Sequence, residues 1–105
     1  MSHRIRFHPL VKRDLDEITN WIIDYAGKEA AGRRLSEIRE TIASLADVPH
    51  RGSIRNEIAP GVRAIPAGRR AVVSFTVDDE TREVHVQAVT HGGADWAARL
   101  RNRAR

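Results

Sequence analysis

Few residues in this sequence combine a reactive side chain with the spacing that an active site requires. The 105-residue chain has five histidines, one tyrosine and no cysteine, and the lack of cysteine excludes thiol catalysis, disulfides and iron–sulfur clusters. The histidines show no i, i+4 pair, so they lack the spacing of a zinc site on a helix. Gly92-Gly93 is too short for a glycine-rich nucleotide fingerprint. We therefore expect no metal and no cofactor.

His91 is the histidine best suited to acid–base chemistry, since an imidazole titrates near neutral pH. It also ends an apolar run and precedes two glycines, a position that suits a structural residue at a turn. We favour a structural or partner-contact role over a catalytic one. Loss of function in His91→Ala with the fold intact would reverse that choice.

The positive charge of the chain is carried almost wholly by arginine. Of 18 Lys and Arg residues only Lys12 and Lys28 are lysines, which leaves 16 arginines and a net charge of +4. Residues 53–105 carry 9 cations against 6 anions, and from residue 97 onward the chain has arginines but no acid. Arginine forks onto carboxylates and phosphates, so an acidic partner is indicated, either a nucleic acid or an acidic protein segment. The alternative is a set of solvated surface charges.

The length of the chain is typical of one domain, here residues 1–105. The N-terminus has no apolar run behind its basic residues, so no secretory signal is expected. No stretch approaches the roughly 18 apolar residues of a membrane span. These features predict no membrane association and a cytoplasmic location.

Hydrophobic spacing predicts the elements that position these side chains. Residues 3–7 alternate between polar and apolar, which predicts a strand. Apolar residues then recur at helical spacing over about 10–26 and 31–45, and the short link around Gly27 folds the two helices into a hairpin. In the first helix Trp21 and Tyr25 share this spacing, so we expect both rings in the core or in the seam of the hairpin rather than stacked on a ligand.

The second half of the chain predicts a sheet. Strands are expected over 62–66, 70–77 and 82–90, after an extended segment over 53–59. Their short links predict an antiparallel meander, and a short helix is expected within 94–105. The opposite sheet face, with His85, Val89 and His91, is predicted to stay uncovered. The side chains predicted to meet the helices are Ala71, Val73, Phe75, Val77, Val84, Val86 and Ala88.

An ordered set of short motifs resembles the RelE/ParE superfamily, the toxins of type II toxin–antitoxin systems. The resemblance extends from Phe7 to about Trp96 and is closest to the ParE-like branch. It implies an α+β fold of the RelE/ParE type, β-α-α-β-β-β, in which the helical hairpin packs on an antiparallel sheet. The motifs are Phe7-His8-Pro9, Asp14-Leu15-x-x-Ile18-x-x-Trp21-Ile22-x-x-Tyr25, Ala30-Ala31, Leu45-x-x-x-Pro49-x-x-Gly52, Pro60-Gly61-Val62-Arg63 and Val86-x-x-Val89-x-His91-Gly92-Gly93.

The resemblance implies one of two activities. RelE-like toxins are ribosome-dependent messenger-RNA endonucleases, whereas ParE-like toxins poison DNA gyrase and block replication. A nuclease of this type uses cations on the sheet with a Tyr or His near the C-terminus; Arg63, His91 and Glu57 are the candidates here. The C-terminal tyrosine is missing, because Tyr25 is the only tyrosine. We therefore expect a gyrase inhibitor that is not an enzyme, with the endonuclease as the alternative and an inactive remnant as a third reading.

The resemblance also implies partners and a physiological setting. The chain is expected to bind a cognate antitoxin in a hetero-oligomer and to act on DNA gyrase, or alternatively on the ribosome and its mRNA. Such systems serve stress responses or plasmid and chromosomal maintenance. An acidic, amphipathic antitoxin tail would meet an apolar groove with a basic rim. Trp96 either packs back on the sheet edge or anchors a partner. The expected partner-binding residues are Arg39, Arg63, Arg69, Arg70 and Trp96.

Overall fold

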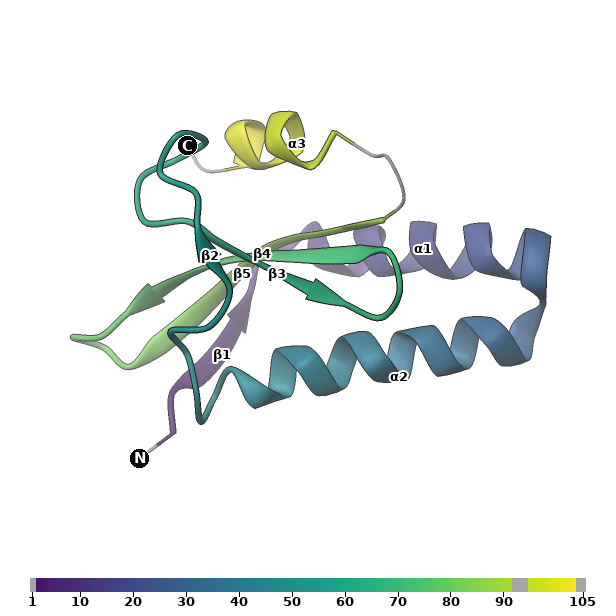
Figure 1. Cartoon of the computed structure of the whole chain (residues 1–105), viewed down its shortest axis with the longest axis horizontal. Coiled ribbons are helices and arrows are strands. Elements are labelled where there is room, and N and C mark those ends of the chain that lie inside the picture. Colours follow the sequence, from purple (N-terminus) through teal and green to yellow (C-terminus); the bar gives the residue numbers. More distant parts are fainter. Residues whose placement is uncertain (1, 92–94, 104–105) are drawn as a thin grey trace.

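The computed structural model describes residues 2–91 and 95–103, which form a helical hairpin packed on a five-stranded sheet (Figure 1). The strand order is β1-β5-β4-β3-β2, with β1 parallel to β5 and the other neighbours antiparallel. The predicted α+β fold and its antiparallel meander are thereby confirmed. The elements are β1 (Arg4–Phe7), α1 (Val11–Ala26), α2 (Lys28–Ser44), β2 (Ser53–Ile54), β3 (Arg63–Ala67), β4 (Ala71–Asp78), β5 (Glu83–His91) and α3 (Trp96–Arg103).

Helices α1 and α2 are joined by a single residue, Gly27. Its φ of 90° lies in the left-handed region, which glycine adopts without strain, so α2 can begin directly where α1 ends. Neither helix, nor α3, is long and apolar enough within the described residues to cross a bilayer. The core between the hairpin and the sheet is formed mainly by Val11, Ile18, Ile22, Ala31, Ile38, Ile42, Leu45, Ile65, Val73, Phe75, Val84, Val86 and Val89.

A β-bulge in β5 changes which side chains face the helices. Phe75 pairs with Val86 and Ser74 pairs with Ala88, so Gln87 is an extra residue without a partner on β4. Side chains alternate along a strand, and an inserted residue therefore reverses the faces beyond it. The assignment of Ala88 to the helix side and of Val89 and His91 to the opposite side was wrong. Val89 joins the core under the helices.

The second face of the sheet is not open, contrary to the sequence prediction. Helix α3 lies against it beside β5 (Figure 1), and Leu100 of α3 is fully buried. Ala64, Ser74 and Ala88 pair across three strands and are also buried there. The fold therefore has a large core beneath the helical hairpin and a small one beneath α3.

Candidate functional site

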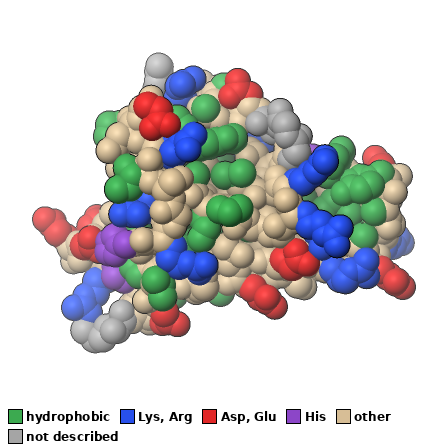
Figure 2. All heavy atoms as spheres, in the orientation of Figure 1, with side chains coloured by type: hydrophobic (Ala, Val, Ile, Leu, Met, Phe, Trp, Pro, Cys, Tyr) green, Lys and Arg blue, Asp and Glu red, His purple; other side chains and the backbone are tan. Residues whose placement is uncertain are grey.

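A cleft of about 690 Å³ lies between the helical hairpin and the β3–β4 turn. The space-filling view shows basic side chains gathered beside apolar ones at this end of the molecule, on the right (Figure 2). We call this feature the arginine cleft. Its lining residues are Ile18, Trp21, Ile22, Tyr25, Ala26, Ala30, Arg33, Arg34, Ile38, Ala67, Gly68, Arg69, Arg70, Ala71 and His91.

The four arginines of the cleft come from two elements that approach one another. Arg33 and Arg34 lie on α2, and Arg69 and Arg70 form the β3–β4 turn. Arg34 donates to Glu37 over 2.9 Å. Within residues 2–91 and 95–103, the other three have no carboxylate within ion-pair distance. The cleft therefore holds uncompensated positive charge.

Three aromatic rings form one wall of the cleft. The Trp21 ring lies 4.1 Å from the His91 ring, at 33°, and 4.6 Å from the Tyr25 ring, at 60°. Trp21 is 38% exposed and Tyr25 is 63% exposed, so the prediction that both rings are buried in the core or in the hairpin seam was wrong. Residue 91 reaches α1 only because the bulge turns it toward the helices. Two of the three rings therefore keep surface open to solvent.

His91 is tuned toward its neutral form. Partial burial lowers the pKa of His91 below its ordinary value; Glu17 opposes this shift and Arg99 adds to it. Its Nδ1 is buried without a hydrogen-bond partner among the described residues. A neutral imidazole stacked on indole serves as a wall of the cleft rather than as a cation.

The candidate nuclease residues are not brought together. Arg63 pairs with Phe75, whereas His91 pairs with Ala71, four residues away along β4. At about 3.3 Å per residue this separation is roughly 13 Å. Glu57 is exposed in the segment between β2 and β3, where it forms a 3.0 Å ion pair with Arg55. An acid, a base and a phosphate-binding cation need to converge on one phosphodiester, and these three residues do not.

The predicted partner residues are scattered over the surface. Arg69 and Arg70 line the cleft, but Arg39 lies on the exposed surface of α2 and Arg63 lies on β3, outside the lining. Trp96 begins α3 and is half-buried, with the Arg55 guanidinium 5.5 Å above its ring. Trp96 therefore packs back onto the protein and keeps a partly exposed edge.

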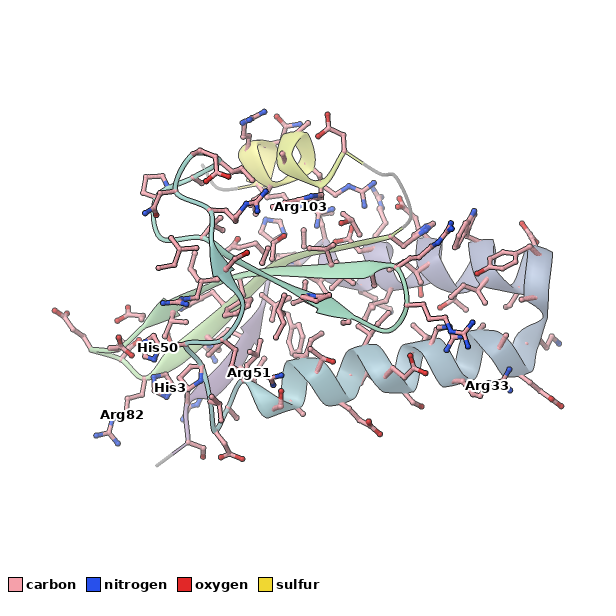
Figure 3. The ribbon with its side chains drawn as sticks, in the orientation of Figure 1. His3, Arg33, His50, Arg51, Arg82 and Arg103 are labelled. Carbon is pink, nitrogen blue, oxygen red and sulfur yellow. The ribbon has the colours of Figure 1, made fainter. Side chains whose placement is uncertain are left out.

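The arginines of α3 have an internal role that the sequence did not indicate. Asp14 on α1 is fully buried, and its carboxylate accepts from both terminal nitrogens of Arg103 and from Arg99. The Val89 N–H donates to the same carboxylate over 3.0 Å, and Arg103 also donates to the Gln87 carbonyl. Figure 3 shows Arg103 beneath α3 on the side of the sheet. We call Asp14, Arg99 and Arg103 the α3 clamp.

The clamp replaces the strand neighbour that β5 lacks at this end. Pairing of β1 with β5 ends at Phe7 and Val86, followed by a bond from the His8 N–H to the Val86 carbonyl. Beyond that point the edge of β5 has no β1 beside it, and buried backbone groups require partners. The carboxylate and guanidinium of the clamp supply them. The clamp thus fixes both α3 and the end of β5 that carries His91.

The residues that sequence reasoning missed had a weak common signal. Asp14 lies seven residues, or about two turns, before Trp21, so both are on one flank of the apolar stripe of α1. That flank turns away from the centre of the hairpin seam. On this flank Asp14 lies near the start of α1, and Trp21 and Tyr25 lie near its end. Such a combination of an acid with aromatic residues indicates the boundary of the core and not its middle.

At the opposite end of the molecule, His3 and His50 lie together (Figure 3). Their Nε2 atoms are 3.2 and 3.0 Å from the two carboxylate oxygens of Asp79. These hydrogen bonds lower the pKa of Asp79. Within the described residues no group of three His, Asp or Glu side chains could hold a metal ion. The cluster ties the β4–β5 turn to the N-terminal segment and to the loop after α2.

Comparisons with known proteins agree with this architecture. A family described as "ParE toxin of type II toxin-antitoxin system, parDE" matches residues 5–96. No curated protein matched the sequence. A chain from the chromosomal ParDE toxin–antitoxin system of P. aeruginosa is 23% identical, with a TM-score of 0.73, covering 86% of this chain and 96% of that one.

Two further structures have the same fold. A chain of the toxin–antitoxin complex RelBE2 from Mycobacterium tuberculosis is 20% identical, with a TM-score of 0.62, covering 88% of this chain and all of that one. A mutant of the E. coli toxin RelE in its free state is 13% identical, with a TM-score of 0.64, covering 99% of this chain and 98% of that one. At sequence identities of 13–23%, the similarity to these three structures shows a shared fold and nothing more.

Proposed function

This chain belongs to the family of ParE toxins of type II toxin–antitoxin systems, and we propose that it inhibits DNA gyrase, blocks replication and is neutralised by a cognate antitoxin. The observation that carries the choice of gyrase is the separation of Arg63 from His91 along the sheet. The lack of a second tyrosine points the same way. A protein without an assembled acid–base set acts by binding rather than by bond cleavage.

One experiment separates this activity from that of a ribosome-dependent endonuclease. The chain is induced alone in bacteria, and the SOS response and gyrase-dependent supercoiling are compared with messenger cleavage on translating ribosomes. SOS induction without cleavage supports gyrase inhibition, and cleavage without SOS induction contradicts it. The double variant Glu57→Gln with Arg63→Gln should remain toxic, whereas an endonuclease that used these residues would lose its toxicity.

The antitoxin partner is proposed from the comparisons and from the distribution of surface arginines. ParDE and RelBE2 are named as toxin–antitoxin systems or complexes. In this chain Arg69 and Arg70 line the cleft, whereas Arg39 on α2 and Arg63 on β3 lie outside it. Positive charges spread over the surface in this way suit a flexible acidic segment of the antitoxin that folds on binding and wraps around the toxin. The complex is then a hetero-oligomer of toxin and antitoxin.

A pull-down with the co-expressed antitoxin tests this basic contact surface. Reversal of all four arginines to glutamate should abolish co-purification, and reversal of Arg69 and Arg70 alone should weaken it. Asp16→Lys, an exposed change on α1 that raises positive charge, is the control and should leave binding intact. Co-purification that survives the fourfold reversal would contradict an acidic antitoxin segment on these arginines.

A further inference from the structure

Only some of the residues that line the arginine cleft are exposed to solvent. The aliphatic residues beneath it are already covered by the protein: Ile18, Ile22 and Ile38 are 2%, 4% and 1% exposed. The lining residues that remain exposed are Trp21, Tyr25, Arg33, Arg69 and Arg70, together with Gly68 and one small aliphatic residue, Ala26. An amphipathic peptide needs an open aliphatic trough for its apolar side chains, and this cleft does not provide one.

Clustered aromatic rings beside unpaired guanidinium groups match the chemistry of a different ligand. Proteins that bind unpaired nucleic acid combine a basic groove along the backbone with aromatic side chains on which bases stack. Arg33, Arg69 and Arg70 have no acidic partner among the described residues, so a phosphate would not have to displace one. Tyr25 is tilted by 60° against Trp21 and extends the row of rings from His91 and Trp21 toward solvent.

We infer that the arginine cleft is a binding site for single-stranded nucleic acid. Arg69 and Arg70 contact backbone phosphates from the β3–β4 turn, Arg33 contacts them from α2, and an unpaired base stacks on Trp21 and Tyr25. Apart from the hydroxyl of Tyr25 and the ring nitrogens of His91, no lining side chain can accept a hydrogen bond from a 2′-hydroxyl. The site is therefore expected to accept both DNA and RNA.

This inference goes beyond the proposed gyrase inhibition and does not depend on it. A chain that induced no SOS response could still bind an oligonucleotide in the cleft, and a gyrase inhibitor could fail to bind one. The two tests use different readouts, so failure of one is distinguishable from failure of the other.

Binding is measured by fluorescence anisotropy of a labelled oligothymidylate of about 12 nucleotides, within the range of known single-strand sites. The full-length chain is used free of antitoxin, over a series of salt concentrations. For single strands the slope of log K against log salt is about −0.7 per phosphate neutralised. Arg69→Gln with Arg70→Gln should therefore reduce the magnitude of the slope by about 1.4.

The matched control is Arg82→Gln with Arg101→Gln, which removes the same charge. Both arginines are exposed; Arg82 lies near the β4–β5 turn at the opposite end of the molecule (Figure 3), and neither lines the cleft. The control should leave the slope nearly unchanged. Equal losses in the two double variants would overturn the proposal, because binding would then follow net charge alone.

The stacking part of the site is tested at Trp21. Trp21→Ala should weaken binding by about fivefold or more, the effect of losing one base–aromatic stack, whereas Trp21→Phe should retain most of the affinity. Circular dichroism of each variant shows whether the fold is kept. Equal affinity of Trp21→Ala and the wild type would contradict stacking.

Three competitors identify the ligand class. Oligouridylate of the same length should bind within about threefold of oligothymidylate, because the 2′-hydroxyl is not singled out. A duplex of the same length should bind more weakly, since its bases are not free to stack. If the duplex binds as tightly, or if oligoglutamate of equal charge displaces the oligonucleotide at the same concentration, the site is a general polyanion or acidic-peptide site and the proposal fails.

Discussion

The two arginine clusters of this protein lie on either side of the end of β5 and use the same side chain in opposite ways. In the α3 clamp, Arg99 and Arg103 converge on the buried carboxylate of Asp14. In the arginine cleft, Arg69 and Arg70 face solvent, with no acid paired to them in the described parts of the chain. One cluster stabilises the fold, and the other is available to a ligand.

This contrast shows why arginine content alone could not locate a binding surface. The acid-free run from residue 97 onward predicted an acidic partner, yet Arg99 and Arg103 already have one within the same chain, 85 and 89 residues away in sequence. Arg69 and Arg70 of the cleft lie between Gly68 and Ala71, outside that acid-free run. Whether an arginine is available for binding depends on the acid that the fold brings to it, and not on the charge of its sequence neighbours.

The largest predicted effect is loss of the clamp carboxylate. Asp14→Asn leaves two guanidinium groups facing a neutral amide in a buried position, and breaking a buried ion pair in this way costs about 3–5 kcal/mol. Urea unfolding should show a corresponding fall in the free energy of unfolding. Asp16→Asn, the same change at an exposed site on α1, should alter it by less than about 0.5 kcal/mol. Equal effects at the two positions would mean that the clamp does not stabilise the fold.

A smaller loss in the free energy of unfolding is predicted for Arg103→Lys, which keeps the positive charge of the α3 clamp but removes the forked guanidinium group. Arg103 uses two terminal nitrogens to bind both Asp14 oxygens and the Gln87 carbonyl, and the single ammonium of lysine cannot repeat that pattern. Arg103→Lys should cost about 1.5–3 kcal/mol, the range for a hydrogen bond to a charged group. Arg70→Lys in the cleft should be nearly neutral. If the two substitutions cost the same, the clamp works through charge rather than through its forked geometry.

The sequence predicted the elements better than it predicted the side chains at their borders. Periodicity located both helices, the meander and the terminal helix, because these depend on local spacing. It placed Val89 and His91 on the wrong face, since one extra residue at Gln87 reverses the alternation and has no sequence signature. Arg69 and Arg70, predicted to bind a partner, line the cleft, and their role in binding stays a prediction. The pairing of Asp14 with Arg103 depends on how α1, β5 and α3 come together, which spacing along the chain cannot show.

On the cleft side, His91 predicts a pH dependence of stability. The pKa of His91 is lowered in the folded protein, so below about pH 6.5, the ordinary value for histidine, the unfolded state binds a proton that the folded state resists. Stability present at pH 7.5 should therefore fall as the pH drops through 6.5 toward the folded pKa. Thermal unfolding at pH 7.5 and 5.5 should show a smaller difference for His91→Gln than for the wild type. An unchanged difference in His91→Gln would contradict the assignment.

The smallest effect on stability is expected for the cleft arginines Arg69 and Arg70, whose loss is expected to weaken the binding of single-stranded nucleic acid. Arg69→Gln with Arg70→Gln removes two exposed cations that make no ion pair within the described residues, so the free energy of unfolding should change by less than about 0.5 kcal/mol. At low ionic strength the double variant should be slightly the more stable, because Arg33, Arg69 and Arg70 repel one another across the cleft and salt screens that repulsion. Urea titrations at low and moderate salt test both points. A loss above about 1 kcal/mol would show that these arginines are structural, as Arg103 is, and the contrast between clamp and cleft would no longer hold.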